Sequence, residues 1–131
     1  MSVDSLDGFS PDLLSALRIM SGLLFLQHGT TKFLSIPASQ MSGVSVTSLP
    51  GMAGVIELVG GAFLVLGLFT RPVAFLASGT MAVAYFLVHH PKGFYPIVNG
   101  GELAALYCFV FLYLAAAGGG RWSIDAMRGA R

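Results

Sequence analysis

Four long apolar runs constrain the fold more than any other feature of the sequence. They occupy residues 13–34, 51–69, 72–89 and 101–117, and charged or turn-forming residues separate them. A helix needs about 17 to 25 predominantly apolar residues to cross a bilayer, so each run is long enough to span it. A helix also satisfies its own backbone hydrogen bonds in lipid. We therefore expect an all-α, integral membrane four-helix bundle that forms a single domain over residues 1–131.

The composition supports the lipid bilayer as the main environment of the chain. Only 10% of the 131 residues are charged, whereas a soluble domain carries about 25%. The formal net charge of +1 gives no reason to expect binding to nucleic acid. The single cysteine, Cys108, excludes both an intramolecular disulfide and a C-x-x-C redox pair.

The topology follows from the even number of spans, which places both termini on one side of the membrane. That side would carry more basic residues than the opposite side, where Lys32 and Lys92 lie. The positive-inside rule then predicts that both termini are cytoplasmic. The basic residues on the side of the termini are Arg71, Arg121, Arg128 and Arg131.

Polar residues inside the runs fall on helix faces. In the first run, spacings of three and four residues place five side chains on one stripe, which we expect to face the bundle interior: Arg18, Ser21, Phe25, His28 and Lys32. In the second run Glu57 shares a face with small residues, which allow membrane helices to approach closely. In the third run Tyr85 and His89 share one face. In the fourth run one face carries Glu102, Leu106, Phe109 and Tyr113.

The depth of these residues predicts a polar layer in the half of the bundle opposite the termini. An ionisable side chain at mid-bilayer costs about 2.5 to 3.5 kcal/mol unless it is paired or hydrated. We expect Lys32, Glu57 and Glu102 to form a paired network there with His28 and His89. Alternatively, Lys32 and His89 reach the membrane interface, and Glu102 is favoured by the helix dipole.

Two further interpretations concern Arg18 and metal binding. Arg18 either takes part in a site or, as the alternative, anchors its end of the helix or pairs with the C-terminal tail. A di-iron site in a helical bundle uses Glu-x-x-His pairs. Neither Glu57 nor Glu102 is followed by histidine three residues later, so we expect no metal.

Four segments together resemble the DoxX family of small four-helix bacterial membrane proteins. They are His28-Gly29-Thr30-Thr31-Lys32; the segment from Gly54 through Glu57 to Gly61, continuing to Gly67-Leu68-Phe69-Thr70-Arg71; Asn99-Gly100-Gly101-Glu102; and Gly120-Arg121-Trp122-Ser123-Ile124-Asp125. The superfamily includes the small subunit of thiosulfate:quinone oxidoreductase. The resemblance implies a multi-pass protein of the bacterial cytoplasmic (inner) membrane. It also implies a soluble or membrane oxidoreductase partner and thiol or sulfur redox chemistry.

Our functional expectation is a component of a quinone-linked oxidoreductase that needs a partner to supply electrons. The catalytic residues would be His28, Glu57, Glu102 and Lys32, with Glu57 orienting His28. The residues around a bound quinone would be Arg18, Phe25, Tyr85, His89 and Asn99. The alternative is a non-enzymatic membrane scaffold or small-molecule-binding partner subunit, and either could form a homo-oligomer. Transport ranks last, because four spans are few for a transporter.

Overall fold

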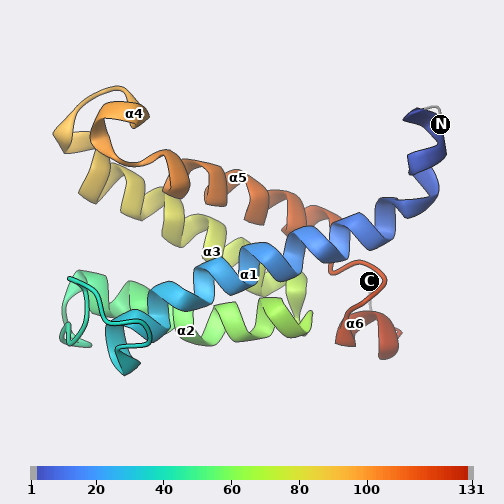
Figure 1. Cartoon of the computed structure of the whole chain (residues 1–131), viewed down its shortest axis with the longest axis horizontal. Helices are drawn as coiled ribbons and strands as arrows, with labels where there is room; N and C mark the ends of the chain where they lie inside the picture. The colour runs from blue at the N-terminus through green and yellow to red at the C-terminus, as the bar shows by residue number, and fades with distance from the viewer. Residues whose placement is uncertain (1–2, 130–131) are drawn as a thin grey trace.

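The structure, a computed structural model, describes residues 3–129, and every regular element in that range is helical (Figure 1). Four long helices form the body of the molecule: α1 (Ser10–Leu34), α2 (Leu49–Leu66), α3 (Thr70–Ala84) and α5 (Glu102–Ala117). The short elements are the 3₁₀ helix η1 (Val3–Phe9), the π-helical turn η2 (Tyr85–His89), the 3₁₀ turn η3 (His90–Lys92), α4 (Pro96–Asn99) and α6 (Ile124–Met127).

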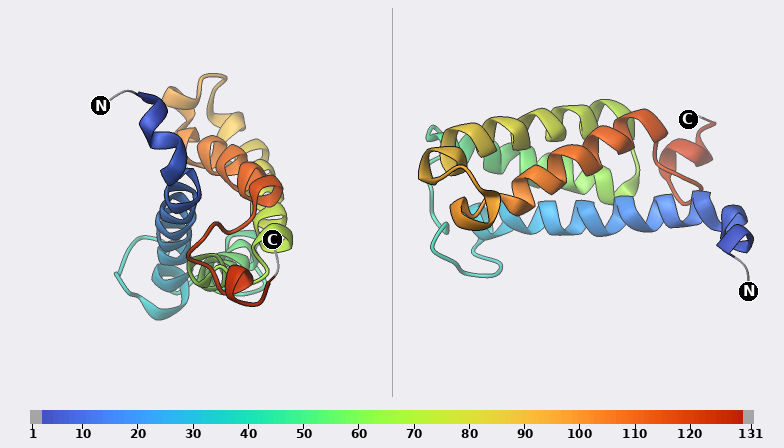
Figure 2. Two further views of the ribbon diagram at one scale, coloured as in Figure 1. Left: turned by 90° about the vertical axis from the view of Figure 1, so that its right-hand side faces the viewer. Right: turned by 90° about the horizontal axis from the view of Figure 1, so that it is seen from above.

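The long helices pack as two pairs. Helix α1 packs mainly against α2, and α3 packs mainly against α5, while α2 and α3 join the pairs and α1 touches α5 at few points (Figure 2). Both described ends of the chain lie at one end of the bundle, which we call the termini end (Figure 1). The α1–α2 loop and α4 lie at the opposite, loop end. The described ends of the chain thus share one end of the bundle, as an even number of spans predicts.

Three helical segments are long and apolar enough to cross a membrane: Val3–Leu34, Leu49–Leu66 and Thr70–Lys92. Helix α5 is apolar but has 16 residues, which corresponds to about 24 Å of helix. The second helix ends before the predicted residue 69, because Gly67 adopts the left-handed conformation (φ 69°) and caps it. The third helix correspondingly begins at Thr70 rather than at residue 72.

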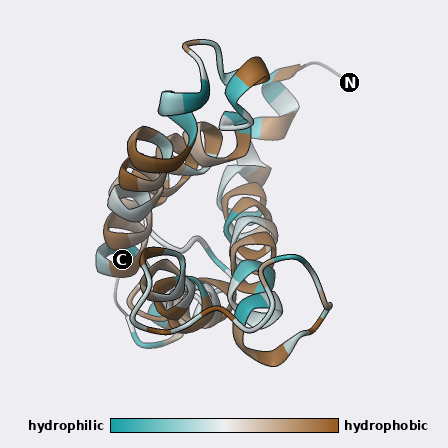
Figure 3. Cartoon of the chain, turned by 90° about the vertical axis from the view of Figure 1, so that its left-hand side faces the viewer, coloured by the Kyte–Doolittle hydropathy of each residue, from teal (hydrophilic) through white to brown (hydrophobic). Residues whose placement is uncertain are grey.

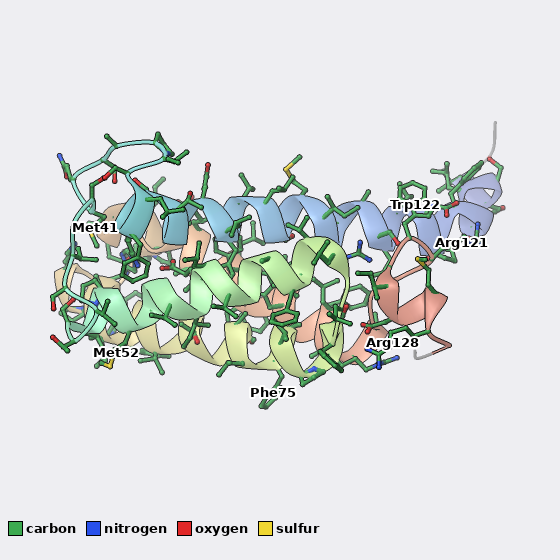
Figure 4. The ribbon with its side chains drawn as sticks, turned by 90° about the horizontal axis from the view of Figure 1, so that it is seen from below. Met41, Met52, Phe75, Arg121, Trp122 and Arg128 are labelled. Atoms are coloured by element: carbon green, nitrogen blue, oxygen red, sulfur yellow. The ribbon has the colours of Figure 1, made fainter. Side chains whose placement is uncertain are left out.

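The outer surface of the bundle is apolar, as expected for a protein surrounded by lipid. The helices are coloured mainly as hydrophobic in Figure 3. Phe75 points away from the bundle and is 66% exposed (Figure 4), and Phe86 and Phe109 are exposed in the same way. Such a surface would promote aggregation in water.

The interior combines a few aromatic rings with small side chains. Helices α1 and α2 approach so closely at Gly29 that a Cβ atom there would lie 2.5 Å from the backbone nitrogen of Leu58. Small residues permit this kind of contact between membrane helices. The buried hydrophobic core consists of Phe25, Leu64, Ala74, Ala77, Met81, Ala104, Tyr107, Phe111 and Leu114.

Candidate functional site

A buried ion pair joins α1 to α2 in the half of the bundle nearer the loop end. Nζ of Lys32 lies 2.5 Å from Oε1 of Glu57, and both residues are less than 10% exposed. The same ammonium donates a hydrogen bond to the carbonyl of Pro50 at 3.0 Å. Each charge therefore has an opposite partner inside the span, where an isolated charge would be costly.

Local sequence explains how this pair forms. Lys32 belongs to the polar stripe of α1, and the burial of Arg18, Phe25 and Lys32 confirms that the stripe faces inward. Gly54 lies one turn before Glu57 on α2, and a Cβ atom there would lie 2.8 Å from Cδ of Lys32. The missing side chain at Gly54 thus leaves the space that the lysine stem occupies on its way to Glu57.

His28 lies beside this pair without a hydrogen bond to it. Its ring is half-buried and meets the ring of Tyr107 edge-on, with the centroids 6.3 Å apart. Within residues 3–129 neither ring nitrogen has a hydrogen-bond partner. Glu57 interacts with His28 electrostatically, but its carboxylate accepts its hydrogen bond from Lys32. The structure therefore does not show the expected hydrogen bond by which Glu57 would orient His28.

Aromatic rings form the wall next to His28. Phe25 is fully buried and meets the rings of Tyr107 and Phe111 edge-on, at centroid distances of 5.8 and 4.9 Å. Tyr107 and Phe111 stack in parallel at 5.2 Å. These rings connect α1 with α5, the two neighbouring helices that have few direct contacts.

A second polar group forms at the loop end around Asn99. Its side-chain amide donates to the hydroxyl of Tyr85 at 3.2 Å and to the carbonyl of Gly93 at 2.9 Å. Its backbone carbonyl lies 3.2 Å from Nδ1 of His89. The structure thus brings three predicted site residues together, although no hydrogen bond among the described residues links them to Lys32 and Glu57. Tyr85 and His89 lie on a π-helical turn, a feature often found at functional sites.

The side chain of Glu102 has no hydrogen bond to either group among the described residues. It is exposed in the first turn of α5, where the helix dipole favours a carboxylate. In the described part of the chain it forms no ion pair. Helix α5 is rotated relative to our expectation, because Leu106, Phe109 and Tyr113 are exposed and Ala104, Tyr107, Phe111 and Leu114 are buried. The prediction that the face with Glu102 and Tyr113 packs inward was therefore wrong.

Arg18 occupies a separate, structural position near the termini end. Its fully buried guanidinium donates to the carbonyls of Leu64 and Trp122, each at 2.9 Å, and also to those of Val65 and Gly119. The last carbonyls of a helix have no partner within that helix. Arg18 thus caps the end of α2 and holds the C-terminal segment, which matches the alternative interpretation.

Asp125 completes the attachment of this segment. Its carboxylate accepts hydrogen bonds from the backbone N–H groups of Phe69 and Thr70, each at 2.9 Å, and so caps the start of α3. Burial alone would raise the pKa of Asp125, but these hydrogen bonds and the charge of Arg128 hold that pKa below its usual value. Arg121, Trp122 and Arg128 lie around the same end of the bundle (Figure 4).

Sequence reasoning missed Tyr107 as a neighbour of His28. Spacings of three and four residues place Tyr107 on one face with Ala104 and Phe111. This apolar face is the one that packs inward, and choosing it over the face that begins with Glu102 would have identified Tyr107. The carboxylate of Glu102 at the start of the helix led us to choose the other face.

Comparison with known proteins decides the family. The family model described as DoxX matches residues 13–90, which include most of α1, all of α2 and α3, and the ion pair. The chain belongs to the DoxX family. No solved structure matches this DoxX chain.

Three relatives of the DoxX chain come from bacteria, and one of them is described as a membrane protein. A Haemophilus influenzae protein of uncharacterised function is 46% identical over 94% of this chain and 96% of its own length. A Mycobacterium tuberculosis protein described as an uncharacterised membrane protein is 24% identical over 88% of this chain and 80% of its own length. A Bacillus subtilis protein named "Putative oxidoreductase CatD" is 30% identical over 83% of this chain and 81% of its own length.

Proposed function

We propose that this protein is the membrane-embedded component of a quinone-linked oxidoreductase system and that the site lies beside His28. The observation that carries the proposal is the imidazole of His28, which is half-buried within a span, beside the Lys32–Glu57 ion pair, and has no hydrogen-bond partner among residues 3–129. The name of the relative CatD supports an oxidoreductase role. We further propose the bacterial inner membrane as its location, with both termini cytoplasmic.

The residues present fit a quinone on chemical grounds. Ligand sites combine apolar or aromatic walls with a few polar groups that fix orientation. Here the rings of Phe25 and Tyr107 supply the wall, and His28 supplies a group that can donate to a ring oxygen. The ammonium of Lys32 neutralises the charge of the Glu57 carboxylate, which lies near the imidazole.

A bound quinone would supply two-electron, two-proton redox chemistry, which none of the twenty side chains can perform alone at such a site. The chain's own part would be to bind the ring and to hold a proton at the imidazole of His28. The electrons would come from a partner of the oxidoreductase class, because the chain has a single cysteine and no flavin or haem motif.

The test measures quinone binding in nanodiscs prepared under mild extraction, with the chain alone and with the proteins that are extracted with it. Decylubiquinone and a short-tailed menaquinone analogue serve as probes. We expect saturable binding that His28→Ala weakens at least tenfold, while His90→Ala, at an exposed histidine, leaves it unchanged. Absence of quinone binding from both preparations would refute the proposal.

A scaffold role is the second candidate, and one observation favours it. Lys32 and Glu57 are bound to each other, and a buried polar pair can fix helix register without any chemistry. On this alternative Glu57→Gln would disrupt assembly or partner recovery, and wild-type preparations would contain a protein partner but no quinone. Mass spectrometry of the extracted nanodiscs distinguishes the two candidates.

A further inference from the structure

The side chain of Tyr107 is buried with its hydroxyl unpaired. The residue is 4% exposed, and its Oη atom has no hydrogen-bond partner among residues 3–129. The large majority of buried polar side-chain atoms in proteins have a hydrogen-bond partner, so an exception needs an explanation. Inside a membrane span the surrounding lipid offers no hydrogen bond in compensation.

The neighbours of Tyr107 belong to the proposed site. Its ring stacks on Phe111 and meets Phe25 and His28 edge-on. Glu57 lies near enough to interact with the phenol electrostatically, yet the hydrogen bond of its carboxylate goes to Lys32. The ring of Tyr107, whose hydroxyl is unpaired, therefore meets the ring of His28, whose nitrogens are also unpaired among residues 3–129.

The position of these two groups indicates where a ligand would lie. Helices α1 and α5 make few direct contacts, and the ring contacts of Phe25 and His28 with Tyr107 bridge the two helices. A flat molecule that enters this seam by separating the rings of His28 and Tyr107 would contact aromatic rings and would meet one polar group from each helix. A ring that carries carbonyl or hydroxyl oxygens satisfies both requirements.

We propose that the hydroxyl of Tyr107 donates a hydrogen bond to an oxygen of the ligand bound beside His28, and that the ligand is a quinone or its reduced form. This inference rests on the proposed function and adds Tyr107 as a residue that contacts the ligand. The ligand oxygen then provides the partner that the hydroxyl lacks within the chain.

The experiment compares Tyr107→Phe with Tyr113→Phe in nanodiscs. Both changes remove one hydroxyl from α5, but Tyr113 is 56% exposed on the outer face and serves as the matched control. Decylubiquinone affinity and the midpoint of thermal unfolding without ligand are measured for each variant and for the wild type. Neither measurement depends on enzymatic activity.

We expect Tyr107→Phe to weaken decylubiquinone binding about two- to tenfold, the range that one hydrogen bond corresponds to. The ligand-free variant should be at least as thermostable as the wild type, because the change removes a buried unpaired group. Tyr113→Phe should leave both quantities unchanged.

Three results would overturn the inference. If the variant binds decylubiquinone as tightly as the wild type, Tyr107 is only a core residue, and the proposed function still stands. If the ligand-free variant is less stable than the wild type, the hydroxyl already has a partner within the chain. If the wild type binds no quinone, the proposed function fails and the inference fails with it.

Discussion

Replacing Arg18 should destabilise the protein and release its C-terminal segment. The guanidinium donates to four backbone carbonyls, and one of these hydrogen bonds, to Val65, is long at 3.5 Å. The other three hydrogen bonds, to Leu64, Gly119 and Trp122, remain for the calculation. Each contributes about 0.6 kcal/mol by the average found in a membrane protein, or about 1.5 kcal/mol at the lower bound for charged donors in soluble proteins. We therefore expect Arg18→Met to lower the free energy of unfolding by about 2 to 5 kcal/mol.

Two measurements check this expectation. Equilibrium unfolding in mixed micelles gives the change in free energy, and limited trypsin digestion reports release of the segment through cleavage after Arg121 and Arg128. Arg18→Lys should have an intermediate effect, because an ammonium lacks the planar fork that reaches several carbonyls. Arg121→Met is the control for the unfolding measurement only, because it removes one of the two cleavage sites. Its side chain is 58% exposed in a pair with Asp12, so the loss should stay below about 1 kcal/mol.

The reasoning would be refuted if Arg18→Met unfolded within about 0.5 kcal/mol of the wild type, the usual range for substitutions away from any special feature. Unchanged trypsin cleavage after Arg121 would separately refute the attachment of the C-terminal segment by Arg18. A loss of stability without faster cleavage would restrict the role of Arg18 to capping α2.

Three further predictions concern other parts of the bundle. Lys32→Met should cost about 3 to 5 kcal/mol because it leaves Glu57 buried without its partner, and the double replacement of both by apolar residues should restore most of the loss in a double-mutant cycle. Because the folded pKa of Asp125 lies below its usual value of 3.8, its contribution is fully present above that value and is lost as the pH falls through the folded pKa. The protection of the Thr70 amide against hydrogen exchange, relative to its intrinsic rate at each pH, should fall over this range, whereas Asp125→Asn should show low protection already at pH 7. Gly29→Val should separate α1 from α2 and lower the unfolding midpoint, and an unchanged midpoint would contradict the close contact of these helices.

The helices and their inner faces were largely predictable where charge and periodicity agreed. In the first run, spacings of three and four residues linked Arg18, Phe25 and Lys32, and all three are buried. Glu57 was predictable as an inward residue because a lone carboxylate within a span requires a partner. These predictions succeeded because the cost of a charge in lipid leaves few alternatives.

Other features depend on contacts between distant parts of the chain. The attachment of the C-terminal segment requires Arg18 and Asp125 to meet backbone groups more than fifty residues away, and no local pattern encodes this. The fourth helix was misjudged because Glu102 lies within its first turn, where its exposure to the loop end removes the cost that would force it inward. The hydrogen bond from Asn99 to Tyr85 depends on the conformation of the segment between η3 and α5, which residue propensities do not specify.

The neutrality of the Lys32–Glu57 pair also determines how the site responds to the voltage across a membrane. Moving one elementary charge through 100 mV corresponds to about 2.3 kcal/mol. The formal charges of the pair sum to zero, so a transmembrane potential does almost no work on it. A net charge gained or lost within the span would instead experience part of that potential, in proportion to its depth. The neutral pair is therefore insensitive to voltage. A proton or electron that reaches the site gives it a net charge and makes it sensitive to voltage.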